Sequence, residues 1–189
     1  KLLDDVVVQE KTEQRSITQA LGYVLAENVI SRVDVPPTDN SAMDGYALNI
    51  NHRAEGALTI SQRITAGSFP QALEQGTAAR IFTGAVIPEG ANAVVMQEQC
   101  VEADGEVSFP QGISLQQNIR PMGQDIRSGS SILDKGRKLR PQDLGLLASI
   151  GVEEVRVYTR LKVAVLSTGD ELLEPGDEPQ PGKIYNSNR

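Results

Sequence analysis

Apolar residues recur at helical spacing in two segments of the chain. In residues 16–28 they follow Ser16, a residue type that caps helices, and the segment ends near Asn28. This pattern predicts an amphipathic helix whose buried face carries Ile17, Leu21, Val24 and Leu25. Residues 141–150 begin with a proline and are followed by Gly151, which predicts a second, shorter helix. Another helix is expected around residues 2–8.

From about residue 56 to residue 126 the helical period disappears. Short apolar segments alternate there with glycine and proline, as in a small β domain. The clearest signal is Asp104-Gly105, a favoured hairpin turn, between two arms of alternating residues in 100–109. We predict further strands at 58–64, 80–82 and 94–96.

The remaining segments predict additional strands. Val29, Ile30 and Val33 indicate extended chain, residues 131–139 predict a hairpin around Lys135-Gly136, and residues 152–157 alternate as a strand does. Residues 163–166 form an unbroken apolar run, which is typical of a strand buried on both faces of a parallel sheet. Because one strand cannot bury both of its faces, we expect a partner or a larger chain to order this tail.

Composition excludes several classes of site. A net charge of −7 and a pI near 4.8 argue against non-specific binding to nucleic acid or an anionic membrane. Cys100 and His52 are the only cysteine and histidine, so neither an intrachain disulfide nor a His/Cys zinc site can form. We find no secretory leader and no run of about 18 apolar residues, and therefore expect a cytoplasmic location. Any metal is expected to be a hard cation on oxygen ligands.

Residues 34–48 combine an extended segment with a compact polar turn. Two prolines hold the chain extended, and Asp39, Asn40 and Ser41 can bond back to their own main chain. We expect Gly45 to adopt a φ that a side chain would forbid, so that a rigid frame places Asp44. The simpler interpretation is a structural turn whose carboxylate accepts backbone N–H groups. The number of polar side chains exceeds what a connecting turn needs, and this favours a functional site.

Residues 39–47, Asp-Asn-Ser-Ala-Met-Asp-Gly-Tyr-Ala, resemble the signature of the MoeA family of molybdopterin molybdenumtransferases, which is related to the E domain of gephyrin. Residues 81–96, 118–126 and 161–172 resemble further blocks of that family in the same order. The chain departs from the family at a few positions. Thr38 replaces a usual aromatic, Asn92 a frequent aspartate, and Pro121 and Met122 stand where basic residues are common.

The resemblance implies a multidomain α+β fold. A small helical/extended domain of residues 1–40 and 127–160, in which the two helices pair, would carry an inserted β domain of residues 41–126. Residues 161–189 would hold the first strand of a truncated α/β molybdopterin-binding domain. The chain lacks an initial Met and stops at a polar run, so we expect a fragment that is inactive alone.

The family's activity is the insertion of molybdenum from molybdate into adenylylated molybdopterin, with release of AMP. Both substrates are anions, and two unit charges about 4 Å apart interact by roughly 4 kcal/mol at an effective dielectric of 20. Bringing them to several carboxylates therefore requires a cation. Mg²⁺ is the expected ion, since carboxylates and substrate phosphates are its usual ligands.

The resemblance also assigns roles to residues. It implies a homodimer in which residues of the β domain reach the molybdopterin-binding domain of the other subunit, with molybdopterin adenylyltransferase as substrate donor. The expected catalytic residues are Asp44, Thr83, Asp125 and Glu171; Ser167, Thr168 and Gly169 bind molybdopterin, and Asp170 and Glu171 bind the metal. Two alternatives stay open. These are a non-catalytic, gephyrin-like scaffold or dimerisation module and a stand-alone β binding module, in both of which the polar blocks are structural turns.

Overall fold

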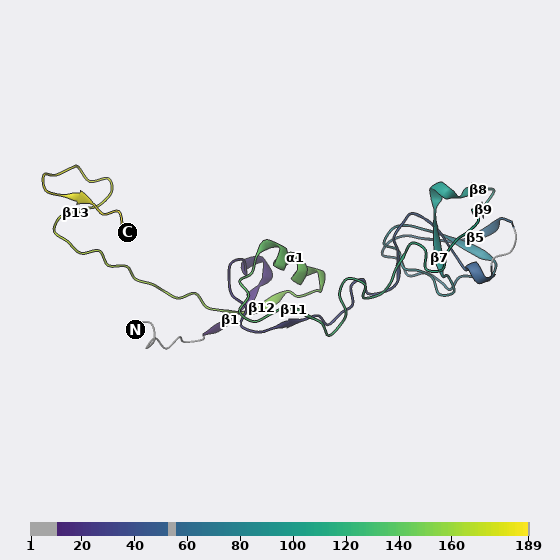
Figure 1. The fold of residues 1–189 in the computed structure, drawn as a ribbon, viewed down its shortest axis with the longest axis horizontal. Coiled ribbons are helices and arrows are strands. Elements are labelled where there is room, and N and C mark those ends of the chain that lie inside the picture. Colours follow the sequence, from purple (N-terminus) through teal and green to yellow (C-terminus); the bar gives the residue numbers. More distant parts are fainter. Residues whose placement is uncertain (1–10, 53–55, 189) are drawn as a thin grey trace.

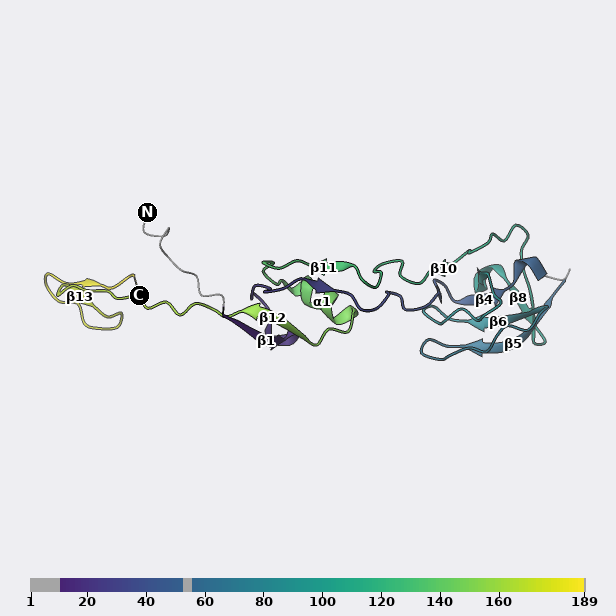
Figure 2. The ribbon, with the colours of Figure 1, turned by 90° about the horizontal axis from the view of Figure 1, so that it is seen from below.

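The structure, a computed structural model, describes residues 11–52 and 56–188 (Figure 1). Within these residues the fold is mostly β with one α-helix. A curled sheet lies at one end of an elongated molecule, the helix lies near its middle, and the last strands lie at the other end (Figures 1 and 2). The helix expected around residues 2–8 lies outside the described residues. No helix in the described part is long and apolar enough to cross a membrane.

The largest sheet of the described residues has six strands in the order β7-β4-β6-β5-β9-β8. Only β5 and β6 are parallel. The strands are β4 (Gly45–Leu48), β5 (Leu58–Ile64), β6 (Thr77–Ile81), β7 (Ala93–Met96), β8 (Val101–Ala103) and β9 (Glu106–Ser108).

The strand predictions for this region are largely confirmed. Residues 58–64 and 94–96 lie in β5 and β7, and the strand predicted at 80–82 is the end of β6. The hairpin in residues 100–109 forms as expected. Asp104 and Gly105 have φ values of 52° and 79°, the positive values that a two-residue turn of this kind requires.

Both faces of the centre of this sheet are buried, so β4 has no exposed residue. Tyr46 and Leu48 pack on one face of the sheet and Ala47 on the other. The Tyr46 face includes Leu58, Ala78, Ala93, Val95 and Val107, and the Ala47 face includes Ile64, Ala79, Ile81, Ala85 and Val94. Alternation along each strand thus supplies two apolar layers.

The second region packs a helix against a two-stranded sheet. β1 (Thr12–Ser16) pairs antiparallel with β12 (Glu154–Tyr158), which confirms residues 154–157 of the strand expected at 152–157. α1 (Pro141–Ser149) confirms the predicted short helix, with proline in its first turn and a φ of 74° at Gly151 after its end. The core of this region contains Ala20, Leu25, Leu133, Leu139, Leu147, Val155 and Val157.

The helix predicted at residues 16–28 is wrong. Only Ile17–Gln19 forms a single 3₁₀ turn, η1, and Ser16 makes no capping bond from its side chain. Gly22 has a φ of 76°, and its N–H donates to the carbonyl of Leu139 at 2.9 Å. The main-chain groups of residues 22–25 thus form hydrogen bonds with residues 137–139, and these groups are not available for helical bonds. The expected packing of this segment against residues 141–150 is observed, since α1 contacts η1.

Two extended segments run side by side between these regions (Figures 1 and 2). β2 (Val29–Ile30) pairs with β11 (Ser131–Leu133), and β3 (Asn40–Ser41) pairs with β10 (Ile119–Arg120). A bridge between Val35 and Ile126 joins them midway. The predicted hairpin in residues 131–139 is therefore wrong. Its turn is present, but both arms pair with residues 24–30.

The strand predicted at residues 163–166 is also wrong. These residues form no strand, and the side chains of Val163 and Leu166 are 80% and 89% exposed. The next strand along the chain is β13 (Leu172–Leu173), which lies parallel to β14 (Ile184–Tyr185). An apolar run becomes a buried strand only when other strands pair with it, and no described residue does so here. The domain bounds stay a prediction.

Asp143 provides a test of how the helical region is stabilised. Its buried carboxylate accepts bonds from the Arg137 guanidinium at 2.7 Å and from the Arg140 backbone N–H at 3.0 Å. The Arg137 bond holds the pKa of this carboxyl below its usual range, although burial opposes the shift. We expect Asp143→Ala to lower the free energy of unfolding by about 2 kcal/mol at pH 7.

The sign of the pH dependence follows from the lowered pKa. The stabilisation is present above the pKa of an unfolded aspartate, about 3.9, and is lost as pH falls toward the folded value. The difference between wild type and Asp143→Ala in urea unfolding should therefore be smaller at pH 3 than at pH 7. Asp134→Ala, which changes a nearby exposed carboxylate, is the control. An equal difference at both pH values would contradict this account.

Candidate functional site

Asp44 and Thr83 are brought together where β4 begins and β6 has ended. The backbone N–H and the Oγ1 hydroxyl of Thr83 both donate to Oδ1 of Asp44 at 2.8 Å. The backbone bond, followed by the hydroxyl bond, lowers the pKa of the Asp44 carboxyl, and the charge of Arg80 acts in the same direction. Asp44 is exposed and therefore presents an ionised carboxylate to solvent at neutral pH.

The turn before β4 is held by bonds to the turn after β6. Ser41 Oγ donates to the carbonyl of Met43 at 2.6 Å, as expected for a polar turn. The Gly84 N–H donates to the carbonyl of Ser41 at 2.8 Å, and the Ser41 N–H donates to the carbonyl of Ala85 at 2.9 Å. These bonds fix Asp44 relative to Thr83.

Gly45 serves this turn for a reason that differs from our expectation. Its φ is not among the positive values of the chain. Instead, a Cβ added at this position would clash with the Val95 carbonyl and would lie 2.8 Å from its carbon. Glycine is required because β7 lies close to Gly45. This closeness results from the pairing of β4 with β7.

Asp125 lies in the segment that runs beside the signature. Its carboxylate accepts a bond from Arg120 Nη2 at 2.6 Å, and its N–H donates to the carbonyl of Val35 at 2.9 Å. In the same segment, the Met122 N–H donates to Asp39 Oδ1 at 2.7 Å. The segment thus contacts the signature, although Asp125 itself is paired with an arginine and not with Asp44.

Arg80 is a residue of this site that sequence reasoning missed. Its Nη1 donates to the carbonyls of Gly45 and Ile81 at 2.8 and 3.1 Å, and its Nη2 donates to Gln97. The guanidinium also lies over the rings of Tyr46 and Phe82. Only the strand order could have revealed this role, because Arg80 faces the signature from a different strand.

Tyr46 completes the polar surroundings of Arg80. Its ring is buried, and its hydroxyl donates to the Glu102 carboxylate. Burial, with this bond as a second cause, raises the pKa of Tyr46 to about 12. The tyrosine of the signature is therefore a neutral, structural group.

The predicted residues near the C-terminal end also lie together. Ser167, Thr168 and Glu171 line a hollow of about 440 Å³ with residues 184–188. The Glu171 carboxylate lies over Gly169, where an added Cβ would fall 2.6 Å from Oε1. Because Gly169 has no Cβ, the Glu171 side chain can occupy this space.

Asp170 and Glu171 are the residues predicted to bind Mg²⁺. Residues 11–52 and 56–188 contain no group of three or more His, Cys, Asp or Glu side chains that could hold a metal. Mg²⁺ is commonly bound by one or two carboxylates together with substrate phosphates and water. Two adjacent carboxylates fit that donor set but cannot form a complete protein cage.

The two groups of predicted residues lie far apart in the chain's own fold. β4 and β6, next to Asp44 and Thr83, belong to the sheet at one end of the molecule (Figure 2). β13, which directly follows Glu171, lies at the opposite end (Figures 1 and 2). One chain in this conformation therefore does not assemble all of the predicted site.

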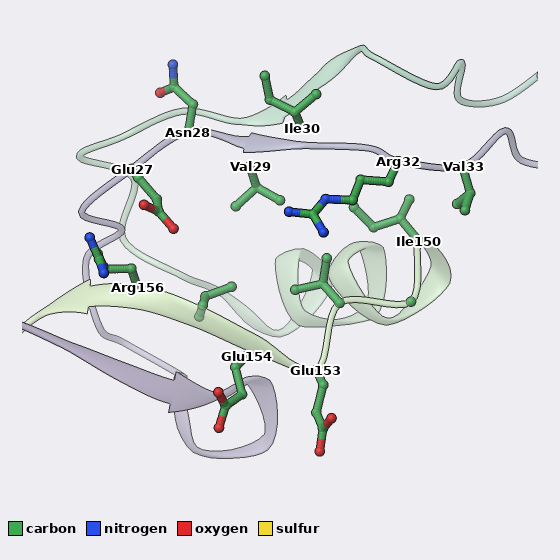
Figure 3. A pocket seen from close by; sticks show the side chains of 13 residues that line it. Glu27, Asn28, Val29, Ile30, Arg32, Val33, Ile150, Glu153, Glu154 and Arg156 are labelled. Atoms are coloured by element: carbon green, nitrogen blue, oxygen red, sulfur yellow. The ribbon is translucent and has the colours of Figure 1, made fainter.

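A separate hollow of about 520 Å³ lies between β2, the end of α1 and β12 (Figure 3). Val29 and Ile150 give it apolar walls, and Glu27, Arg32 and Arg156 surround it with charges of both signs. None of the residues predicted for the functional site lines it.

The bond between Thr83 and Asp44 gives a direct test of the site geometry. We expect Thr83→Val to raise the pKa of the Asp44 carboxyl, because one of the two bonds to Oδ1 is removed while the backbone bond stays. NMR titration of the carboxyl carbon measures this change. Thr83→Ser, which keeps the hydroxyl, should titrate like wild type. An unchanged pKa in Thr83→Val would show that the hydroxyl does not bond the carboxylate in solution.

The chain matches known proteins over its whole length. The family model described as "MoeA N-terminal region (domain I and II)" matches residues 1–151. The chain is 43% identical to the molybdopterin molybdenumtransferase of Haemophilus influenzae, over 100% of this chain and 48% of that protein. It is 36% identical to the protein of the same name from Staphylococcus epidermidis, over 96% of this chain and 45% of that protein. The chain thus spans about half the length of the curated relatives it matches.

Solved structures agree with the sequence comparison. The molybdopterin biosynthesis MoeA protein of Pyrococcus horikoshii superposes with a TM-score of 0.88 at 35% identity, over 99% of this chain and 52% of that chain. A second structure of a MoeA protein from the same organism gives a TM-score of 0.87 at 33% identity, over 99% of this chain and 50% of that chain. Motifs, fold and relatives agree, and the chain belongs to the MoeA family.

Proposed function

We propose that this chain contributes the Asp44–Thr83 part of a molybdopterin molybdenumtransferase that acts in molybdenum cofactor biosynthesis. The observation that carries the proposal is the pair of hydrogen bonds that Thr83 donates to Asp44. These bonds fix an ionised carboxylate at an exposed strand end. The relatives that share this chain's sequence are named for that activity.

The proposed substrates are adenylylated molybdopterin and molybdate, with AMP as the released product. Asp44 orients the substrate or the attacking water, and Thr83 keeps its carboxylate ionised and in place. Asp125 is held by Arg120 and assists from the segment that runs beside the signature. Ser167, Thr168 and Gly169 bind the pterin beside Glu171.

Asp170 and Glu171 are the proposed ligands of Mg²⁺, together with substrate phosphate oxygens. When bound, the ion lowers the repulsion between carboxylates and anionic substrates. The hollow beside Glu171 supports this assignment, because Ser167 and Thr168 supply neutral hydroxyl groups around the carboxylate.

A homodimer is part of the proposal. Asp44 and Glu171 lie at opposite ends of one chain, so a second copy can supply what the first lacks (Figure 2). In this arrangement residues 161–189 begin an α/β molybdopterin-binding domain whose exposed apolar run, Val163 to Leu166, is covered by further strands. Molybdopterin adenylyltransferase is the proposed substrate donor, and the cytoplasm the proposed location.

The test is a molybdenum insertion assay with the full-length protein. We expect insertion and release of AMP in the presence of Mg²⁺, and loss of both after chelation with EDTA. Binding of adenylylated molybdopterin without turnover in Mg²⁺ would instead favour the gephyrin-like scaffold. Binding of neither substrate would leave a β binding module as the better description.

A further inference from the structure

A row of side chains crosses the sheet beside the Asp44–Thr83 pair. Arg63 of β5 is paired with Arg80 of β6, and Arg80 is paired with Tyr46 of β4. Both guanidinium groups contact the Phe82 ring, with their central carbons 4.5 Å (Arg63) and 4.4 Å (Arg80) from the ring centre. Phe82 directly precedes Thr83. The row therefore places two positive charges next to the proposed site.

The two arginines differ in what their N–H groups do. Arg80 donates to the carbonyls of Gly45 and Ile81 and to Gln97, so its donors hold the fold together. Arg63 is exposed, and among the described residues the Phe82 ring is the one aromatic ring that its guanidinium contacts. No described carboxylate lies within 4.0 Å of its guanidinium. A guanidinium carries five N–H donors, and stacking on a ring leaves its edges open to a ligand.

The position of Arg63 relative to Asp44 suits a ligand that contacts both. β5 and β4 are the two neighbours of β6 in the sheet. Because strands are spaced by about 4.8 Å, side chains on β5 and β4 lie roughly 10 Å apart across β6. An anion placed over Phe82 and Thr83 would be repelled by the Asp44 carboxylate unless a positive group faced it from the other side. Two positive groups lie on the Phe82 ring, Arg80 and Arg63, and Arg63 is the exposed one.

We propose that the Arg63 guanidinium, which lies over the Phe82 ring, binds an oxyanion of the substrate beside Asp44 and Thr83. The inference rests on the proposed function for the identity of the ligand, which is either a phosphate of the pterin nucleotide or molybdate. A guanidinium donates two parallel bonds to either oxyanion, so both share the same recognition chemistry. Arg63 is thus a binding residue that the sequence blocks do not contain.

Arg160 provides a matched control. Its guanidinium lies 4.3 Å from the ring centre of Tyr23 and is exposed, so it makes the same kind of contact outside the site. If Arg63 and Arg160 only cover the rings that they contact, substitution of either should leave anion binding unchanged. If Arg63 binds an oxyanion, only its substitution should weaken anion binding.

The experiment measures binding of molybdate and, separately, of AMP to the full-length protein by calorimetry. We expect Arg63→Met to raise the Kd of at least one of these probes by about tenfold, which is typical for loss of bonds to a charged group. Arg160→Met should leave both values unchanged. Arg63→Lys should regain part of the affinity, because it keeps the charge without the planar fork. The probe that responds identifies the oxyanion.

Two outcomes overturn the inference. One is equal binding of both probes by wild type and Arg63→Met; the other is equal weakening in Arg160→Met. Thermal melting of each variant separates binding from folding, and Arg63→Lys supplies the test if Arg63→Met unfolds. Failure of the proposed function is distinguishable, since it appears as absent molybdenum insertion by wild type, whereas this inference is read from binding alone.

Discussion

Full-length protein with Asp44→Asn is expected to insert molybdenum more slowly by a factor on the order of a hundred or more, the usual scale for loss of a positioned proton-accepting group. The Asn Oδ1 can still accept both bonds from Thr83, so the turn should keep its shape. The charge alone is removed. Glu171→Gln should cause a similar loss, because an amide is a poor ligand for Mg²⁺. Initial rates of molybdenum insertion, with melting temperatures as a check on folding, measure both.

Mixing the two inactive variants tests where the site is assembled. If Asp44 of one copy meets Glu171 of the other, a mixed dimer contains one intact site and one doubly altered site. Random exchange between equal amounts should then restore about a quarter of the wild-type rate, since half of the dimers are mixed. No recovery after demonstrated subunit exchange would exclude a shared site. Wild-type rates in both single variants would end the assignment of these residues.

The second large effect concerns Gly45. We expect Gly45→Ala to lower the free energy of unfolding by about 3 kcal/mol or more, at the upper end of the range for overpacked cores. The three atoms nearest to the added methyl group are main-chain atoms of Val95 and Met96, which belong to the paired strand and cannot move aside singly. Such a loss is a large part of the stability of an ordinary domain. Urea unfolding followed by circular dichroism measures it.

Gly145→Ala is the matched control for this variant. Gly145 lies within α1, and nothing lies within 4 Å of a Cβ added there. Alanine should stabilise the protein by roughly 0.5–1 kcal/mol, because it restricts the unfolded chain and favours the helix. If Gly45→Ala were as stable as wild type, β7 could not approach β4 as closely as described.

The predictions from sequence succeeded where local signals decide the structure. The turn at Asp104-Gly105 and the proline start of α1 were identified because backbone preferences of a few residues suffice there. The 16–28 helix failed, and Leu21, which was expected on its buried face, is 50% exposed. Leu25 is buried as predicted, but by pairing with Arg137 and with Val157 of β12, which the local pattern does not contain.

For the site, the sequence by itself determined the family, the acidic residues and their order along the chain. Asp44 and Thr83 were named from separate motifs, and only the pairing of β4 with β6 showed that they bond to each other. The reason that Gly45 is a glycine and the roles of Arg80 and Arg63 were likewise decided by the sheet. Motifs record which side chains are present, whereas contacts between strands depend on register, and register is set by the packing of the whole sheet.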